Sequence, residues 1–293
     1  MDERAALELI GGLVDAAGDD AAVIEETVLT IDMLHAETDF FQGTTPYTMG
    51  WRSVGASLSD VAAMGARATG TVAVYGAPDF AADPLTRFIE GATDVSAVTD
   101  AEYVGGDLDG HDEVTIATTA IGEATSPVFR DGGTPGEVVC VTGTLGRSAA
   151  AVAHFRAGNA ERGNELFQFE PRVAAGRRLA EHATAMMDSS DGLARSLHQL
   201  AEASDVGFAI DGDAVPIAPS LRSIRGDGAF QEGITFGEDF ELVCTLPETE
   251  VAAARSALDV PLSVLGRVTH PDDGVRLDGD PLADEGWTHG RSN

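Results

Sequence analysis

A single aspartate set into an otherwise apolar, alanine-rich stretch is the feature that most restricts how this chain can fold. Asp60 lies in "SVGASLSDVAAMGA" (53–66), where small and apolar residues recur at helical spacing and indicate a buried helix. A carboxylate that is buried without a partner is costly, so the fold must bring a cation to it. Arg52, eight residues earlier, could supply an ion pair. We favour a bound metal ion, and the ion pair stays open.

Several aspartates stand beside glycine, serine or threonine rather than in charged runs. Each one alone has an ordinary structural interpretation. Asp107 follows Gly-Gly and could lie in a hairpin turn, and Asp188 and Asp191 could be helix N-caps that each stabilise by about 1 kcal/mol. Together they suggest oxygen ligands for Mg²⁺ ions that hold a highly charged ligand such as a nucleoside triphosphate. The segments are "GDDAAV" with Asp19 and Asp20, "TIDM" with Thr30 and Asp32, "SLSDVAAMGA" with Asp60, "VGGDLDG" with Asp107, and "MDSSDG" with Asp188, Ser190 and Asp191.

The charge balance limits the possible partners. The chain has 49 acidic and 18 basic residues, a net charge of −31, and every basic residue is arginine. Nucleic acid and anionic membranes are poor partners, because binding them requires cationic patches. The absence of lysine excludes the Walker A lysine and Schiff-base chemistry. Such acidity suggests a halophilic protein from a salt-loving cytoplasm, where carboxylates keep the surface hydrated and salt screens their repulsion.

The sequence shows no sign of export or of membrane insertion. No apolar run approaches the roughly 18 residues that a membrane span needs, and the charged start "MDERAALELI" is unlike a secretory signal. We therefore expect a cytoplasmic protein. Cys140 and Cys244 stand in strand-like apolar runs and are expected to be buried thiols. The seven histidines show no zinc-ligand spacing.

Strands and helices are mixed along both halves of the chain, and 125–137 is rich in proline and glycine. Antiparallel neighbours among the expected strands favour the α+β class. We predict domains at 1–125 and 136–293, joined by a linker at 126–135. The expected helices are 3–17, 49–66, 83–100, one from Ser148, 171–183, one ending at Ala203 and one near 248–258. The expected strands are two within 21–40 that meet in a turn at Glu25–Glu26, then 68–78, 101–107, 113–124, 137–143, 206–211, 234–247 and 262–269.

Seven segments, in matching order, resemble the thiamine-monophosphate kinases, a family with the aminoimidazole-ribonucleotide-synthetase-like fold. The resemblance covers nearly the whole chain. It implies a two-domain α+β architecture, in which an N-terminal sheet domain binds ATP and Mg²⁺ and pairs two chains into a homodimer, and a C-terminal domain is α/β. The segments are "GDDAAV", "TIDML", "SVGASLSDVAAMGA", "VGGD", "VTGTLGRSAA", "MDSSDGLARSLHQLAEASDVGFAID" and "GEDFELVCTLP".

The resemblance also implies site residues. Metal ligands fall on Asp20, Thr30, Ile31 through its backbone oxygen, Asp32, Asp60, Asp107, Asp188 and Asp191; ATP contacts fall on Gly106, Asp107, Arg130 and Ser190; substrate contacts fall on Asp39, Glu238 and Trp287. Two positions depart from the family pattern, because Asp39 stands where histidine is usual and Ile31 where a threonine ligand is usual. Arg130 could instead be an interdomain surface charge, and Trp287 a terminal hydrophobic anchor.

The activity implied by the resemblance is ATP-dependent phosphorylation of thiamine monophosphate to thiamine diphosphate with several Mg²⁺ ions. We expect direct in-line transfer without a general base. The second pKa of a phosphate monoester is about 6, so the attacking oxygen is already anionic near pH 7. Three alternatives stay open: an enzyme of the same fold that uses ATP on another acceptor, a non-catalytic Mg²⁺–nucleotide-binding subunit, and a structural protein whose acids are all on the surface.

Overall fold

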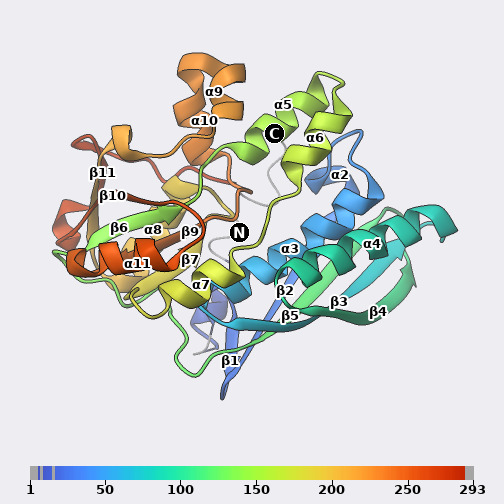
Figure 1. Ribbon diagram of the computed structural model, residues 1–293, viewed down its shortest axis with the longest axis horizontal. Coiled ribbons are helices and arrows are strands. Elements are labelled where there is room, and N and C mark those ends of the chain that lie inside the picture. Colours follow the sequence, from blue (N-terminus) through green and yellow to red (C-terminus); the bar gives the residue numbers. More distant parts are fainter. Residues whose placement is uncertain (1–5, 7–8, 15–16, 288–293) are drawn as a thin grey trace.

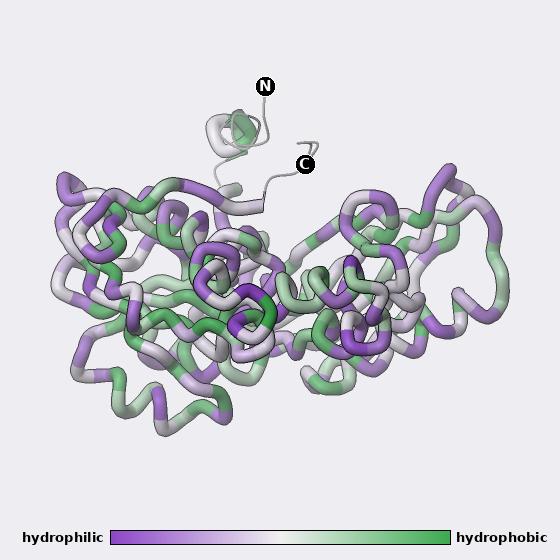
Figure 2. The backbone as a smooth tube through the Cα atoms, turned by 90° about the horizontal axis from the view of Figure 1, so that it is seen from above, coloured by the Kyte–Doolittle hydropathy of each residue, from purple (hydrophilic) through white to green (hydrophobic). Residues whose placement is uncertain are grey.

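The computed structural model describes residues 6, 9–14 and 17–287, which form two β-sheets with helices packed on them (Figure 1). Viewed from above, the molecule consists of two lobes side by side (Figure 2). Neighbouring strands in the described sheets are antiparallel except for the pairs β3–β4 and β8–β11. Mostly antiparallel sheets with helices from both halves of the chain confirm the predicted α+β class.

The sheet from the first half of the chain has five strands in the order β1-β2-β5-β3-β4. Side chains alternate between its two faces, so that Val28 and Leu34 of β2 are buried whereas Ile31 and Met33 are exposed. The first two strands meet at a turn with a positive φ at Glu25, as predicted. The strands are β1 (Ala22–Ile24), β2 (Thr27–His35), β3 (Arg67–Ala77), β4 (Glu102–Gly110) and β5 (Thr115–Glu123).

Helices α3 (Pro46–Ala63) and α4 (Ala82–Val98) cover the buried face of this sheet (Figure 1). Pro46 opens α3 at a position that suits its fixed φ and missing N–H. The two helices touch through their backbones, because a Cβ on Gly50 would lie only 2.0 Å from the carbonyl oxygen of Phe88. The small residues of the predicted 49–66 helix therefore serve close packing, as expected.

The sheet from the second half has seven strands in the order β12-β11-β8-β10-β6-β9-β7. Cys140 on β6 lies directly opposite Cys244 on β9, and both are free and buried, as predicted. The strands are β6 (Val138–Thr142), β7 (Ala185–Asp188), β8 (Gly207–Ile210), β9 (Leu242–Leu246), β10 (Leu262–Thr269), β11 (Val275–Leu277) and β12 (Asp280–Pro281). The helices of this half are α5 (Arg147–Arg156), α6 (Ala160–Phe167), α7 (Val173–Leu179), α8 (Leu193–Ser204), α9 (Pro219–Arg225), α10 (Ala229–Thr235) and α11 (Val251–Ala257).

Two predicted strands are longer than the observed ones. The strand expected up to residue 40 ends at His35, and α2 (Ala36–Asp39) follows it. Of the strand predicted over 234–247, only β9 is extended, and the prediction for 234–241 is wrong. Glu238 and Phe240 have positive φ values, which a strand does not accommodate.

Other predicted elements differ in part. Helices α6, α9 and α10 were not expected from the sequence, whereas α3, α4, α5, α7, α8 and α11 match predicted helices within a few residues. Of the predicted 3–17 helix, residues 6 and 9–11 are helical, and residues 1–5, 7–8 and 15–16 lie outside the described residues. The predicted C-terminal domain ends in residues 288–293, which also lie outside them.

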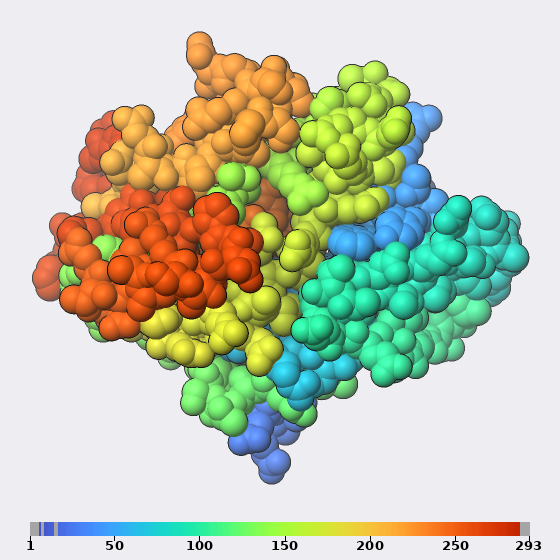
Figure 3. Space-filling model, in the orientation of Figure 1, coloured from blue at the N-terminus to red at the C-terminus, as the bar shows by residue number. Residues whose placement is uncertain are grey.

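The two sheets are joined by the segment between Glu123 and Val138, where the linker was predicted. The blue to teal first half and the orange to red last part occupy opposite sides of the molecule (Figure 3). Helix α3 lies where they meet, because it contacts β2 on one side and β7 and α7 on the other. The division at 125 and 136 stays a prediction. Within the described ranges, no helix has both the length and the apolar character to cross a bilayer.

Candidate active site

Three carboxylates from separate parts of the chain meet beside α3. Asp20 precedes β1, Asp60 lies in the last turn of α3, and Asp188 ends β7. One oxygen of each carboxylate lies within 4.8 Å of the other two, and Asp188 is buried. The structure therefore brings together three of the residues for which the sequence suggests a metal-binding role. We call Asp20, Asp60 and Asp188 the acidic cluster.

Hydroxyl and amide donors orient the cluster. Thr30 on β2 donates its hydroxyl hydrogen bond to Asp60. Ser59 on α3 donates to one oxygen of Asp188 at 2.6 Å, and the backbone N–H of Ser190 donates to the other at 3.0 Å. Asp60 and Asp188 are thus held in one orientation while part of their oxygen surface stays directed at the neighbouring acids, as in metal sites with supporting outer contacts.

Asp32 lies near the acidic cluster, on the face of β2 that packs against α3. The hydroxyl of Ser57, on α3, donates to a carboxylate oxygen of Asp32 at 2.6 Å. The charge of Asp32 is also among the causes that raise the pKa of Asp60. Thr30 and Asp32 are two residues apart on one strand, so both face α3, as the period of a strand requires.

Burial and crowding make the cluster electrostatically unfavourable when it is fully charged. Burial, followed by the charges of Asp32, Asp188 and Asp20, holds the pKa of Asp60 well above its ordinary value. Burial, followed by the charge of Asp20, raises the pKa of Asp188 to about 7. A divalent cation removes this repulsion, and the donor set contains oxygen only, which suits Mg²⁺. The chemistry of these residues therefore fits the predicted metal.

Arg130 supplies one positive charge to the cluster. Its Nη2 and Nε donate to the two oxygens of Asp20 at 2.8 and 3.1 Å, and its backbone N–H donates to Asp19 at 3.0 Å. Burial acts against the charge, but the carboxylate of Asp20 outweighs it and raises the pKa of Arg130. Arg130 is thus largely buried and ion-paired, and the interpretation as an interdomain surface charge is wrong.

The loop after β7 begins at the cluster, because the N–H of Ser190 bonds to Asp188, and Asp191 follows in the same loop. Helix α8 begins after Gly192, whose φ of 99° is in the left-handed region that favours glycine, and Gly192 rather than an aspartate is its N-cap residue. Asp188 is a residue of β7, so its interpretation as a helix cap is wrong. The loop also packs against Gly237, where a Cβ would lie 2.4 Å from the carbonyl oxygen of Ser190.

The three residues expected to contact substrate line one small hollow. Its walls come from α2, the end of α6, the loop before β9 and the segment that ends at Trp287. The hollow adjoins the loop after β7, because Glu238 donates its N–H to the Ser190 carbonyl at 2.6 Å and Trp287 donates its N–H to that of Asp191 at 3.0 Å. We call it the aromatic hollow, and its lining residues are Thr38, Asp39, Phe41, Phe167, Phe236, Glu238 and Trp287.

Asp39 has a structural role in addition to lining the aromatic hollow. It ends α2, and one of its oxygens accepts the N–H of His35 at 2.7 Å and the hydroxyl of Thr38 at 2.9 Å. These bonds fix the side chain across the short helix. Trp287 lines the same hollow near the end of the described chain, so both interpretations given for it, substrate contact and hydrophobic anchor, are compatible with its place.

Gly106, Asp107 and the Ile31 side chain lie away from the acidic cluster. Asp107 is inside β4 rather than in a hairpin turn, so the turn interpretation is wrong. It pairs with Val74, which is on the exposed face of the sheet, and its exposed carboxylate accepts the N–H of the neighbouring Leu108 at 2.9 Å. Strand β4 is three positions from β2 in the sheet order, a separation of about 14 Å. The side chain of Ile31 is 76% exposed on the same open face.

The sequence did not predict the residues that support the site. Ser57 and Ser59 orient Asp32 and Asp188, and their signal was two hydroxyls beside Asp60 in an apolar helix. The ion pair considered between Arg52 and Asp60 is wrong. Arg52 donates to the carboxylate of Glu238 at 2.5 Å instead.

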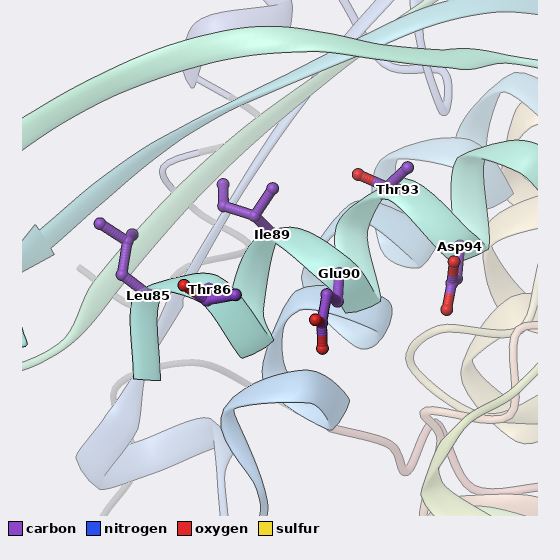
Figure 4. Close-up of a pocket in the computed structure, with 6 residues that line it drawn as sticks. All are labelled: Leu85, Thr86, Ile89, Glu90, Thr93 and Asp94. Carbon is purple, nitrogen blue, oxygen red and sulfur yellow. The ribbon is translucent and has the colours of Figure 1, made fainter. Parts of the chain in front are cut away.

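A second hollow lies outside this region, along the outer side of α4 (Figure 4). All its lining residues belong to that one helix, and none of them was predicted to have a functional role. They are Leu85, Thr86, Ile89, Glu90, Thr93 and Asp94. The acidic cluster and the aromatic hollow, where several segments converge, are therefore the candidate active site.

Both halves of the chain are similar to known protein families. The family model "AIR synthase related protein, N-terminal domain" matches residues 18–124, and the corresponding C-terminal domain model matches residues 134–278. These matches agree with the two-domain architecture expected from the sequence.

Several named proteins are similar along their full length. The thiamine-monophosphate kinase of Halobacterium salinarum is 64% identical over 289 residues, which cover 99% of this chain and 100% of that protein. The thiamine-monophosphate kinase of Methanospirillum hungatei is 36% identical, with 99% of each chain covered. The solved structure of AaThiL complexed with AMPPCP and TMP matches with a TM-score of 0.89 at 26% identity, over 98% of this chain and 97% of that one.

Proposed function

Since the chain belongs to the AIR synthase related proteins, and among them to the thiamine-monophosphate kinases, we propose that the acidic cluster and the aromatic hollow together perform its reaction. That reaction is the ATP-dependent phosphorylation of thiamine monophosphate to thiamine diphosphate. One observation carries the assignment to this site: three carboxylates meet within 4.8 Å, and one loop joins them to a hollow lined by all three expected substrate contacts.

Mg²⁺ is proposed as the cation of the acidic cluster, with Thr30, the Ile31 carbonyl, Asp32 and Asp191 as further ligands. The support is the all-oxygen donor set, its fixed orientation and the raised pKa values of Asp60 and Asp188. Bound Mg²⁺ neutralises phosphate charge and so reduces the repulsion between two polyanionic substrates. The chain itself holds the carboxylates apart from bulk water and in place through Ser59 and Thr30.

ATP is proposed to bind over the loop after β7, with Ser190 and Arg130 as contacts. The guanidinium of Arg130 is already close to the acidic cluster through Asp20, so a short movement would let it meet a phosphate. The acceptor phosphate attacks in line and needs no general base, because its oxygen is anionic near pH 7. The chain contributes by orienting both substrates and by presenting fixed charges to the transferred group.

Thiamine monophosphate is proposed to place its ring system in the aromatic hollow. Trp287 and the phenylalanines offer flat faces for stacking, which also suits a cationic ring. The carboxyl group of Asp39 adds negative charge to the same hollow, whereas that of Glu238 is paired with Arg52. Asp39 thus gives this chain an acid where the family usually has histidine.

A homodimer is proposed to form through the open face of the first sheet. This face exposes many large apolar side chains, and such patches usually mark an interface. Asp107 and Gly106 lie on the strand at its edge, so in a dimer they would meet the second chain and contribute to its nucleotide site. The exposed apolar residues are Leu29, Ile31, Met33, Val74, Val104 and Ile121.

A halophilic cytoplasm is proposed as the setting. The support is the net charge of −31, the consumption of ATP, and the identity to the Halobacterium salinarum protein. The deciding experiment measures ADP formation from ATP and thiamine monophosphate at high KCl, with Mg²⁺ and with EDTA. Formation of ADP and thiamine diphosphate only with Mg²⁺ supports the proposal. ADP formation with another acceptor instead would indicate a different enzyme of this fold, and nucleotide binding without ADP formation would indicate a non-catalytic subunit.

A further inference from the structure

Arg52 is a fully buried arginine on α3 that the mechanism above does not use. Its guanidinium lies 3.6 Å above the ring of Phe167, and Nη1 donates to the carbonyl oxygen of Phe167 at 2.8 Å. Nη2 donates to Glu238 twice, to the backbone carbonyl at 2.9 Å and to the carboxylate at 2.5 Å. Phe167 and Glu238 both line the aromatic hollow, so one side chain holds two of its walls.

The Glu238 wall needs such support because its backbone is in an unusual conformation. Glu238 has a φ of 64°, which residues other than glycine rarely adopt. Three contacts fix it there: the Arg52 bonds, the hydroxyl of Ser148, which donates to the Glu238 carbonyl at 2.6 Å, and the Glu238 N–H bond to Ser190. Strain of this kind persists where surrounding contacts hold it, and it often occurs at functional sites.

Stability alone is a poor reason for a buried arginine at this place. Removing a guanidinium from water is costly, and an ion pair in the interior often does no better than apolar packing. The compensation for Arg52 is also incomplete, because its Nε has no hydrogen-bond partner among the residues that the structure describes. A role in positioning explains why the charge is there.

Helix α3 connects this support to the acidic cluster. Arg52 and Ser59 are seven residues apart and share one side of the helix, and Asp60 follows directly. Eight residues of α-helix span about 12 Å. One rigid element therefore carries the anchor of Glu238, the donor to Asp188 and a member of the acidic cluster.

We propose that Arg52 is a positioning residue for the phosphate acceptor: through Glu238 and Phe167 it fixes the aromatic hollow at a set distance from the acidic cluster. This rests on the proposed function, because it assumes that the aromatic hollow binds the acceptor. Lysine cannot replace Arg52, since a single ammonium group cannot reach Phe167 and both Glu238 oxygens with the planar geometry of a guanidinium.

The test measures steady-state kinetics of the full chain at high KCl with each substrate varied in turn. For Arg52→Lys we expect the KM for thiamine monophosphate to rise about tenfold to a hundredfold, the range for losing bonds to a charged group, and kcat to fall. The KM for ATP should stay within about twofold, because the bonds of Arg52 go to Phe167 and Glu238 and not to the proposed ATP contacts Arg130 and Ser190. Ser148→Ala loosens Glu238 without burying a new charge and should show the same pattern more weakly, so the test remains decisive if Arg52→Lys does not fold.

Glu238→Gln shows whether Arg52 acts through Glu238. If it does, Arg52→Lys in the Glu238→Gln background should raise the KM for thiamine monophosphate far less than it does in the wild type. Full additivity of the two effects would overturn the proposal.

Arg172→Lys is the matched control. Arg172 is also largely buried and pairs with Glu241 in the same loop at 2.6 Å, but neither residue lines the aromatic hollow. We expect it to lower the melting temperature and leave both KM values unchanged. The positioning role would be refuted if Arg52→Lys and Arg172→Lys changed the KM for thiamine monophosphate equally. It would also be refuted if neither Arg52→Lys nor Ser148→Ala changed this KM. A wild-type chain that makes no ADP with thiamine monophosphate would instead refute the proposed function.

Discussion

Asp188→Asn should make the metal-free protein more stable at alkaline pH while removing its response to Mg²⁺. Asp188 is 1% exposed, and burial followed by the charge of Asp20 raises its pKa from 3.8 to about 7. Asparagine keeps the shape. Its oxygen can still accept the Ser190 N–H, and its amide can donate to the hydroxyl of Ser59, which rotates freely.

The magnitude follows from linkage. A raised pKa means that the folded chain binds this proton more tightly than the unfolded chain does, so stability falls as the pH rises from about 4 to about 7 and stays low above that. With a pKa of about 7 in the folded chain and 3.8 in the unfolded chain, the loss between pH 5 and pH 8 is about 3 kcal/mol. The substitution removes this loss. For a chain of 293 residues, that corresponds to about 5 °C in melting temperature.

The assay is thermal unfolding at pH 5 and pH 8, at constant KCl, with EDTA or with Mg²⁺. In EDTA we subtract the melting temperature of the wild type from that of Asp188→Asn. This difference should be about 5 °C larger at pH 8 than at pH 5. Mg²⁺ should stabilise the wild type at pH 8 and leave the variant unchanged, because ligands that bind only the folded state stabilise it.

Asp272→Asn is the control, because it removes one charge from an exposed turn. It should show neither the pH dependence nor the loss of the Mg²⁺ response. If Asp188→Asn has the same effect at both pH values, or is still stabilised by Mg²⁺ as strongly as the wild type, the reasoning about the acidic cluster is wrong.

Three further outcomes are expected. Asp60→Asn and Asp107→Asn should each be inactive. If each site takes Asp107 from the other chain of a dimer, mixing the two variants should restore about a quarter of wild-type activity, because half of the randomly paired dimers then hold one intact site of two. No recovery after mixing would contradict the shared site. Ile31→Glu should convert dimers to monomers in analytical ultracentrifugation, since it places a charge on the exposed apolar face, and an unchanged mass would exclude that face as the interface. Gly50→Ala should lower stability by about 2–4 kcal/mol in denaturant titrations, because its Cβ would overlap the Phe88 carbonyl, and a loss below about 0.5 kcal/mol would show that the helices can separate.

Local sequence patterns were sufficient to find part of the site. Asp60 could be singled out because a carboxylate in an apolar helix needs a cation or a partner, and the structure shows it beside two other acids. The period of a strand likewise predicts that Thr30 and Asp32 share a face, and both face α3. Their joint position with Asp188, however, depends on how two sheets pack, which spacing along the chain does not encode.

Other parts of the site could be proposed only from the family resemblance. Asp39, Glu238 and Trp287 are far apart in sequence, and no local pattern connects them. The error over 234–241 has a related cause. Its apolar and aromatic residues are typical of a strand, but the positive φ values of Glu238 and Phe240 are maintained by contacts from distant residues, including Arg52 and Ser148.

Three of the 18 arginines, Arg52, Arg130 and Arg172, are turned inward and pair with the carboxylates of Glu238, Asp20 and Glu241. The outside of the molecule is therefore even more one-sidedly negative than its composition suggests. ATP and a phosphorylated acceptor are anions too, so they must approach against a repulsive field. Dissolved salt shortens the reach of that field, from about 10 Å at 0.1 M to about 3 Å at 1 M. Encounter with substrate should consequently become faster as ionic strength rises, the reverse of the usual behaviour of enzymes that attract their substrates by charge.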